Sequence, residues 1–181
     1  MSDSSSRLLV WADHSSTGLD GLTERLAEVF GQLESIPIDP HADLVRNDTV
    51  LLVLFGSDSW AMLRWMEKLD PDDSVNVIVV VDDSHLGTDT GRDRAPVSGA
   101  AVSAVRSLAV QRGTKVRANA ICVATSVSGV RTEMRGPLPV VPTVEDVVEA
   151  VSFLAGPDAA YLSGQVLYLN CGRQLFSSHT S

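Results

Sequence analysis

Basic residues are scarce in this sequence, which has 14 Lys and Arg against 23 Asp and Glu and a formal net charge of −9. Proteins that bind nucleic acid need clustered Lys and Arg to contact phosphates. Proteins that dock on anionic membranes need basic segments for the same electrostatic reason. The charge therefore argues against nucleic acid and against a membrane surface as partners.

Long apolar runs and cysteines are also few. No apolar run approaches the ~20 residues that a membrane-spanning helix requires, and the first residues, Met-Ser-Asp-Ser-Ser-Ser, do not resemble a secretory signal. Of the two cysteines, Cys122 falls in an expected strand and Cys171 comes just after another, which favours two buried, reduced thiols over a disulfide. These absences predict a cytoplasmic protein.

What is present is ordinary for a globular protein. The 181 residues are 44% hydrophobic and 20% charged, which excludes a disordered chain. This length favours one domain that spans residues 1–181. The polar ends, residues 1–6 and 177–181, are expected to be disordered tails.

Short apolar runs alternate with segments of helical periodicity. A continuous run of apolar residues such as Val75–Val81 is typical of a strand that is buried on both faces of a parallel sheet. Thr143 is a good helix N-cap, with acidic residues in the turn that follows it. The pattern predicts an α/β fold, with strands at 7–12, 32–38, 49–55, 75–81, 116–123 and 165–169 and helices at 19–30, 60–69, 99–112 and 143–154.

The segment from Gly99 to Gly172 resembles the C-terminal half of the short-chain dehydrogenase/reductase family. It contains the phrases RSLAVQRGTKVRANAI and TVEDVVEAVSFLAGPDAAYLSGQVLYLNCG in the order and at the spacing of that family. The resemblance implies a Rossmann-like, doubly wound parallel sheet. The chain is shorter than a usual member, and only residues 39–48 separate the second expected strand from the third. We therefore expect a shortened sheet of about six strands, with fewer helices than the full fold.

The resemblance also shows where the cofactor loop should be. In the family, a glycine-rich loop after the first strand lets the backbone approach the pyrophosphate of the dinucleotide. Counted back from the helix phrase Glu24-Arg25-Leu26-Ala27, the glycine positions fall on Asp13, Thr17 and Leu19. The Asp13 carboxylate and the side chains of Thr17 and Leu19 would therefore occupy the space in which the backbone of the family's loop contacts the pyrophosphate. We therefore expect this chain to bind no nicotinamide cofactor.

The catalytic Tyr-x-x-x-Lys motif of the family is also missing. Counted back from Arg106, the tyrosine position falls on Arg94 and the lysine position on Ser98, and no tyrosine precedes Tyr161. Ser84 could replace the family's serine, but without the tyrosine it has no proton to relay. We expect no catalytic, cofactor-binding or metal-binding residues of the reductase kind.

The polar segment after the fourth expected strand leaves two alternatives open. Paired carboxylates and a histidine can carry out acid/base or metal chemistry, although a polar, glycine-containing segment such as residues 82–94 is usually a solvated surface loop. The first alternative is an enzyme of altered chemistry. The second is a small-ligand-binding protein that uses the vacated cofactor pocket. The first alternative would use Asp83, Ser84 and His85, and Asp82 and Arg94 lie in the same segment.

Two expected helices, 60–69 and 99–112, match helices that line a subunit contact in the resembled family. Trp and Met, which are enriched at interfaces, occur on both sides of the first helix, and small residues on the second would let another helix approach closely. We therefore expect an inactive subunit that pairs with an active homologous dehydrogenase/reductase, or with itself, and stabilises it or shapes its site. By analogy, the complex acts on a hydroxyacyl or ketoacyl substrate. The interface candidates are Trp60, Trp65, Met66, Ala101, Val105 and Phe176.

Overall fold

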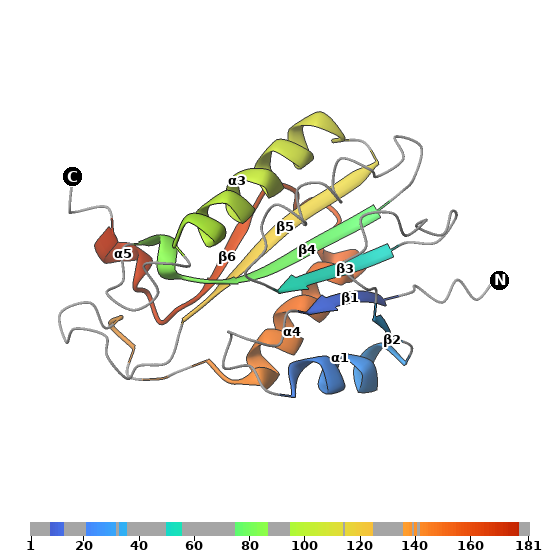
Figure 1. The fold of residues 1–181 in the computed structure, drawn as a ribbon, viewed down its shortest axis with the longest axis horizontal. Coiled ribbons are helices and arrows are strands. Elements are labelled where there is room, and N and C mark those ends of the chain that lie inside the picture. Colours follow the sequence, from blue (N-terminus) through green and yellow to red (C-terminus); the bar gives the residue numbers. More distant parts are fainter. Residues whose placement is uncertain are drawn as a thin grey trace.

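The computed structural model in Figure 1 describes a central sheet with helices on both faces. The described residues are 8–12, 21–31, 33–35, 50–55, 75–86, 95–113, 115–124, 136–138, 140 and 142–177, and in 8–12, 33–35, 50–55 and 176–177 only the backbone is described. The expected helix 60–69, with Trp60, Trp65 and Met66, lies outside these residues. So do the tail 1–6 and all of the tail 177–181 except Ser177.

Six parallel strands form one sheet in the order β2-β1-β3-β4-β5-β6 within the described part of the chain. After β2 the chain returns past β1 to β3, so the direction of winding reverses between β1 and β3, as in a doubly wound sheet. This order confirms the shortened, Rossmann-like parallel sheet. The strands are β1 (Leu8–Ala12), β2 (Leu33–Ser35), β3 (Val50–Phe55), β4 (Val75–Asp82), β5 (Val116–Val123) and β6 (Val166–Leu169).

Helices cover the two faces of the sheet (Figure 1). Helices α1 (Leu22–Phe30) and α4 (Val144–Ala155) lie on one face, and α3 (Ala95–Gln111) lies on the other. Three short helical turns complete the described elements: η1 (Ser84–Leu86), η3 (Pro157–Ala159) and α5 (Gln174–Ser177). None of the described helices has the length and apolar character needed to cross a membrane.

Helix α3 begins at Ala95, four residues before the predicted start at Gly99. Pro96 occupies its first turn, where a missing backbone N–H costs nothing because that group has no partner within the helix. Helix α4 begins as predicted. Thr143 accepts a hydrogen bond from the Asp146 backbone, and Asp146 accepts one from the Thr143 backbone at 2.6 Å.

The strand residues alternate between two hydrophobic cores, one on each face of the sheet. The residues of β4 and β5 that face α3 pack against its inner side, and those that face α1 and α4 pack against these two helices. The α3 core contains Val75, Val77, Val79, Val81, Ala101, Val102, Ala104, Val105, Leu108, Val116, Ala118, Ala120 and Cys122. The other core contains Leu22, Leu26, Ile78, Val80, Ile121, Val123, Val147, Val148, Ala150, Val151, Leu154 and Ala159.

Two interface candidates therefore need correction. Ala101 and Val105 are 1% and 0% exposed and belong to the core between α3 and its own sheet. They cannot be offered to another subunit while that core is intact. Small residues occur on several sides of α3, so the sequence alone does not tell its inner face from its outer face. Of Phe176 only the backbone, in α5, is described.

Candidate functional site

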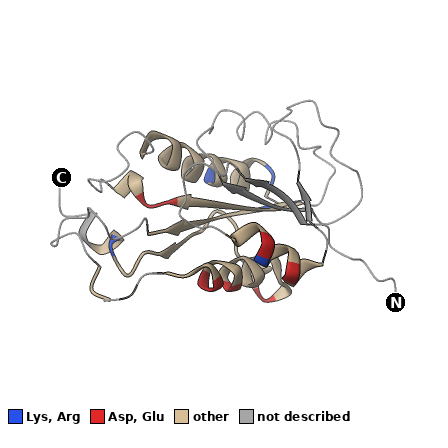
Figure 2. Ribbon diagram, turned by 60° about the horizontal axis from the view of Figure 1, so that its bottom comes forward, with Lys and Arg blue, Asp and Glu red and all other residues tan. Residues whose placement is uncertain are grey.

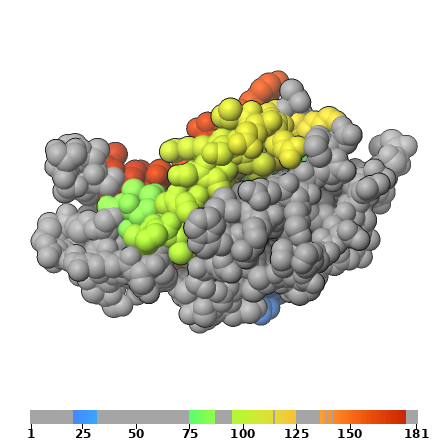
Figure 3. Space-filling view, turned by 45° about the horizontal axis from the view of Figure 1, so that its top comes forward, coloured from blue at the N-terminus to red at the C-terminus, as the bar shows by residue number. Residues whose placement is uncertain are grey.

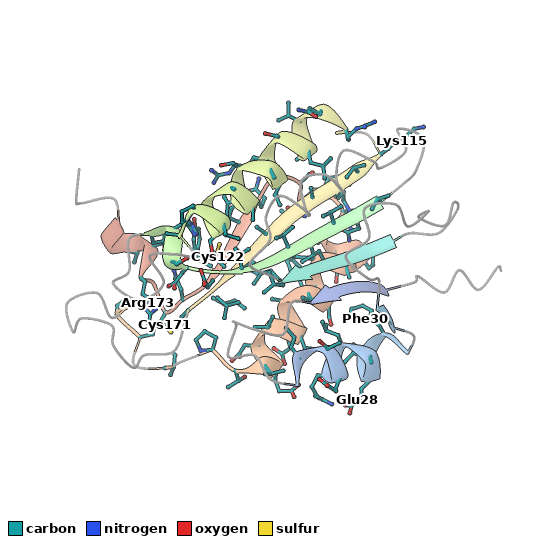
Figure 4. All side chains as sticks on the ribbon, in the orientation of Figure 1. Glu28, Phe30, Lys115, Cys122, Cys171 and Arg173 are labelled. Atoms are coloured by element: carbon teal, nitrogen blue, oxygen red, sulfur yellow. The ribbon has the colours of Figure 1, made fainter. Side chains whose placement is uncertain are left out.

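Polar residues follow two strands, β4 and β6, at the carboxyl edge of the sheet. Open α/β sheets bind ligands at this edge. Residues 82–85 come from the end of β4, and residues 170–173 follow β6, with the end of β5 between them. Figure 4 shows Cys122, Cys171 and Arg173 gathered at this edge of the molecule. The site is built from these two segments and from the first turns of α3.

The carboxylate of Asp82 ties the end of β4 to α3. Its Oδ1 accepts hydrogen bonds from the Ser84 hydroxyl, from the Ser84 backbone at 3.1 Å and from the Ser98 hydroxyl at 2.6 Å. The two hydroxyl oxygens are 3.2 Å apart. The hydroxyl of Ser98, the residue that the resemblance aligns with the family's lysine, is therefore bonded within the chain.

The next carboxylate, Asp83, is fully buried in an ion pair. Its Oδ2 lies 3.3 Å from Nη1 of Arg173, and the two side chains are 0% and 5% exposed. The expectation that residues 82–94 form a solvated loop is therefore wrong for Asp83 and for Ser84, which is 1% exposed. A buried carboxylate requires a partner, and Arg173 supplies it. Arg94 lies outside the described residues.

His85 is held between α3 and β6. Its ring centroid lies 6.3 Å from that of Tyr168, and its Cβ is 3.7 Å from where a Cβ would stand at Gly99. Both ring nitrogens are buried, and neither has a hydrogen-bond partner within the described segments. Burial lowers the pKa of His85, against the opposing effects of Asp82 and Asp83. The ring is therefore neutral under ordinary conditions.

A tyrosine does reach this edge, although not from the position that the family uses. Tyr168 of β6 packs against the α3 core beside Cys122. Burial raises the pKa of Tyr168, and burial with the nearby carboxylates raises the pKa of Cys122 to about 12. The catalytic tyrosine of the family needs a lowered pKa, which a neighbouring lysine supplies. Neither the phenol nor the thiol is activated here.

Residues 136–138 and 140 lie directly on the turn that follows β6. A Cβ at Gly136 would lie 1.9 Å from the Cys171 carbonyl oxygen, and a Cβ at Gly172 would lie 2.7 Å from Pro137 Cδ. The Cys171 thiol donates to the Val140 carbonyl. Cys171 and Gly172 both have left-handed backbones, with φ of 58° and 82°. The close approach covers the end of β6 and leaves no room for a side chain at either glycine.

Asn170, directly after β6, is also buried at this edge of the sheet. It is 0% exposed, and neither atom of its side-chain amide has a hydrogen-bond partner among the residues that the structure describes. The sequence analysis singled out neither Asn170 nor Arg173. An isolated Arg directly after a Cys-Gly turn is the one signal in the sequence that could have pointed to a buried partner.

Among the described residues, the polar groups at this edge bond mainly to one another. Each described hydroxyl near the carboxylates bonds to Asp82, and no described hydrogen bond joins His85 to Ser84 or Ser98, as activation of a nucleophile would require. Across the described ranges no group of three or more His, Cys, Asp or Glu side chains could hold a metal ion. Asp13, Thr17 and Leu19 lie outside these ranges.

No family model and no curated protein matches the sequence. Among solved structures, a glucose/ribitol-type short-chain dehydrogenase/reductase from Brucella melitensis is 15% identical with a TM-score of 0.66, over 92% of this chain and 96% of that chain. An aldohexose dehydrogenase from Thermoplasma acidophilum is 14% identical with a TM-score of 0.65, over 94% of each chain. A 3-alpha-hydroxysteroid dehydrogenase from a Pseudomonas species, complexed with NADH, is 17% identical with a TM-score of 0.60, over 96% and 99%. Such identities establish the fold alone.

Proposed function

We propose that this chain, which has the fold of the short-chain dehydrogenases/reductases, is a catalytically inactive subunit that pairs with an active enzyme of the same fold. It would stabilise that enzyme or shape its active site. By analogy with heteromeric members of the family, we place the complex in the cytoplasm and assign it a hydroxyacyl or ketoacyl substrate. A pair of identical copies is the second form that such an assembly could take.

The loss of catalysis is supported by what occupies the family's catalytic positions. Ser98, at the lysine position, is 3% exposed and donates to Asp82. It carries no charge to lower the pKa of a phenol or to hold a ribose. Tyr168, the phenol that lies near this edge, has its pKa raised by burial. Among the described residues, no phenol has the lowered pKa that the family's catalytic tyrosine needs to transfer a proton.

The outer face of α3 is the observation that carries the pairing proposal. Between Ala95 and Gln111 the helix contains no Asp or Glu, and Val110 is 86% exposed. The centres of protein interfaces are depleted of charge in this way. Figure 3 shows α3 as a continuous strip across one face of the molecule. The exposed residues of this outer face are Pro96, Ser103, Arg106, Ser107, Val110 and Gln111.

The opposite layer of helices differs in charge. Glu145, Asp146 and Glu149 of α4 are exposed, as are two glutamates of α1. Figure 2 shows these acidic residues gathered on the α1 and α4 layer. Arg25 of α1 bonds to Glu145 of α4 at 2.7 and 2.9 Å, which fastens the two helices to each other at the surface. Carboxylates in this number are typical of a solvated face, so the contrast favours α3 as the side that meets another subunit.

Co-expression with matched surface variants tests the proposal. The chain is produced together with each full-length short-chain dehydrogenase/reductase encoded in the same genome, and native mass spectrometry measures the mass of the assembly. We expect a heteromer for the wild-type chain and for Glu149→Arg on α4, and a loss of the heteromer for Ser103→Arg on α3. A wild-type chain that stays monomeric beside every one of these enzymes, or two variants that behave alike, contradicts the proposal.

One observation favours a second candidate, a small-ligand-binding protein. The buried amide of Asn170 lacks partners within the described residues, and a polar ligand or a water molecule could supply them. The enzyme of altered chemistry has less support, because Asp83 and Ser84 are buried and already bonded within the protein. A thermal-shift screen against uncharged polar metabolites separates the ligand-binding protein from the inactive subunit. A stabilising compound whose effect Asn170→Ala abolishes favours ligand binding, and no shift favours the subunit.

A further inference from the structure

The two ring nitrogens of His85 are buried without a side-chain hydrogen-bond partner, and the nearby backbone of Asp82 opposes the lowering of the His85 pKa. His85 lies on η1, which packs against α3 at Gly99, and its ring faces Tyr168 of β6. Neither Nδ1 nor Nε2 reaches solvent, and neither makes a hydrogen bond to a described residue. Burying a neutral imidazole without hydrogen bonds costs a moderate free energy, whereas burying a charged imidazolium without hydrogen bonds costs much more.

The charges around His85 decide which protonation state the closed structure accepts. Asp82 and Asp83 come from β4, Arg106 from α3, Cys122 from β5 and Tyr168 from β6. The two carboxylates would attract an imidazolium, while Arg106 repels it. Both carboxylates are already engaged, Asp82 by two serines and Asp83 by Arg173. Desolvation is the largest effect, and it lowers the pKa of His85.

The turn that carries His85 is short. It spans Ser84–Leu86, with a hydrogen bond of 3.0 Å from Leu86 to the Asp83 carbonyl and bonds from Ser84 to Asp82 and Ser98. None of these bonds joins η1 to the backbone of a neighbouring strand, so η1 can open locally without breaking the pairing of the sheet. Cys122, which pairs with Tyr168 between β5 and β6, is 0% exposed.

We propose that His85 is a pH-operated latch: when the ring takes up a proton, η1 swings away from α3 and β6 and opens the end of β5 around Cys122. In the open state the imidazolium is hydrated. The N-terminal turns of α3 then lose the packing at Gly99 and the anchor that Ser84 shares with Ser98. The latch does not depend on whether the chain pairs with another subunit.

The pH range follows from the direction of the shift. Because the pKa of His85 in the closed state lies below its ordinary value of 6.5, the open state binds the proton more tightly. The closed state is therefore fully favoured above about pH 6.5. It loses stability as the pH falls from there to the pKa of the closed state. Within that interval, the ratio of open to closed molecules rises about tenfold for each pH unit by which the pH falls.

The test measures how fast Cys122 reacts with an aromatic disulfide that attacks thiols in acid, in a Cys171→Ser background. The pH is lowered from about 7.5 to about 5, where histidine titrates. We expect the rate to rise in this chain as the pH falls below about 6.5, and to stay level in His85→Gln and His85→Leu, which cannot be protonated. A wild-type rate that stays level, or equal rises in both variants, overturns the proposal.

Hydrogen exchange separates the latch from general acid unfolding. After correction for intrinsic exchange, the proposal predicts lost protection in Ser84–Leu86 and the first turns of α3, with α4 still protected. Equal loss in α4 means that the whole domain opens, which contradicts a local latch. The comparison also remains informative if one His85 variant folds poorly, because the wild-type chain alone gives a decisive pattern.

Discussion

Arg173 reaches from the turn after β6 to Asp83 at the end of β4, with Nη1 and Oδ2 3.3 Å apart and both side chains buried. Strand β5 lies between these two strands in the sheet. The ion pair therefore joins the ends of two strands that are not neighbours, and it fixes the carboxyl edge from β4 to β6.

Removal of the arginine should be costly. Arg173→Met leaves the Asp83 carboxylate buried without its cation, and we expect it to lower the free energy of unfolding by about 3–5 kcal/mol. Urea denaturation followed by circular dichroism measures the change. The double variant Asp83→Asn/Arg173→Met removes the stranded charge and should cost less than the single change. A single variant as stable as the wild type would show that the pair is not buried in solution.

A second prediction concerns Gly136, which packs against the Cys171–Gly172 turn. Ala at Gly136 would place its Cβ 1.9 Å from a backbone oxygen, which cannot move aside as a flexible side chain can. We expect Gly136→Ala to destabilise the fold by about 1–3 kcal/mol, as overpacking does.

A matched control for Gly136→Ala is available in α3. A Cβ at Gly99 meets His85 only at ordinary contact distance, 3.7 Å. Because Gly in a helix costs about 0.5–1 kcal/mol relative to Ala, Gly99→Ala should raise the melting temperature while Gly136→Ala lowers it. Equal effects would mean that the loop does not lie on the turn.

The N-cap of α4 gives a third prediction, with a pH dependence. Thr143→Ala removes the hydroxyl that donates to Asp146 at 2.7 Å, and such caps contribute about 1 kcal/mol. The bonds from Thr143 lower the pKa of Asp146 below its usual 3.8. The contribution should therefore be present above that pH and disappear as the pH falls through the lowered value.

Denaturation at neutral pH and in strong acid measures this difference for Thr143→Ala. Thr143→Ser keeps the hydroxyl and should match the wild type at both pH values. A cost that is the same at both pH values would show that Asp146 does not take part in the cap.

The strands were predictable because a strand that is buried on both faces appears in the sequence as a continuous apolar run. The expected runs 75–81 and 116–123 agree with β4 and β5 to within one residue. The doubly wound parallel sheet followed from the resemblance, and its shortening followed from the short connection after β2. The start of α3 was missed because the helix was expected only from Gly99, although Pro96 is acceptable in a first turn.

The site was less predictable, because its contacts are distant in sequence. Asp83 and Arg173 are 90 positions apart, and no local pattern links them. Asp83 was therefore expected to be solvated. Ala101 and Val105 were expected to face a partner, since the small residues of α3 do not reveal which side meets the sheet. Helical periodicity locates a face only when polar and apolar residues separate clearly.

The central claim is that the fold has been kept while cofactor chemistry has been lost. Calorimetric titration of the purified chain with NADH, and separately with NADPH, tests it most directly, since hydride transfer in the family requires one of these ligands. The account predicts no saturable heat up to millimolar concentration. Saturable binding of either dinucleotide at one site per chain would contradict it.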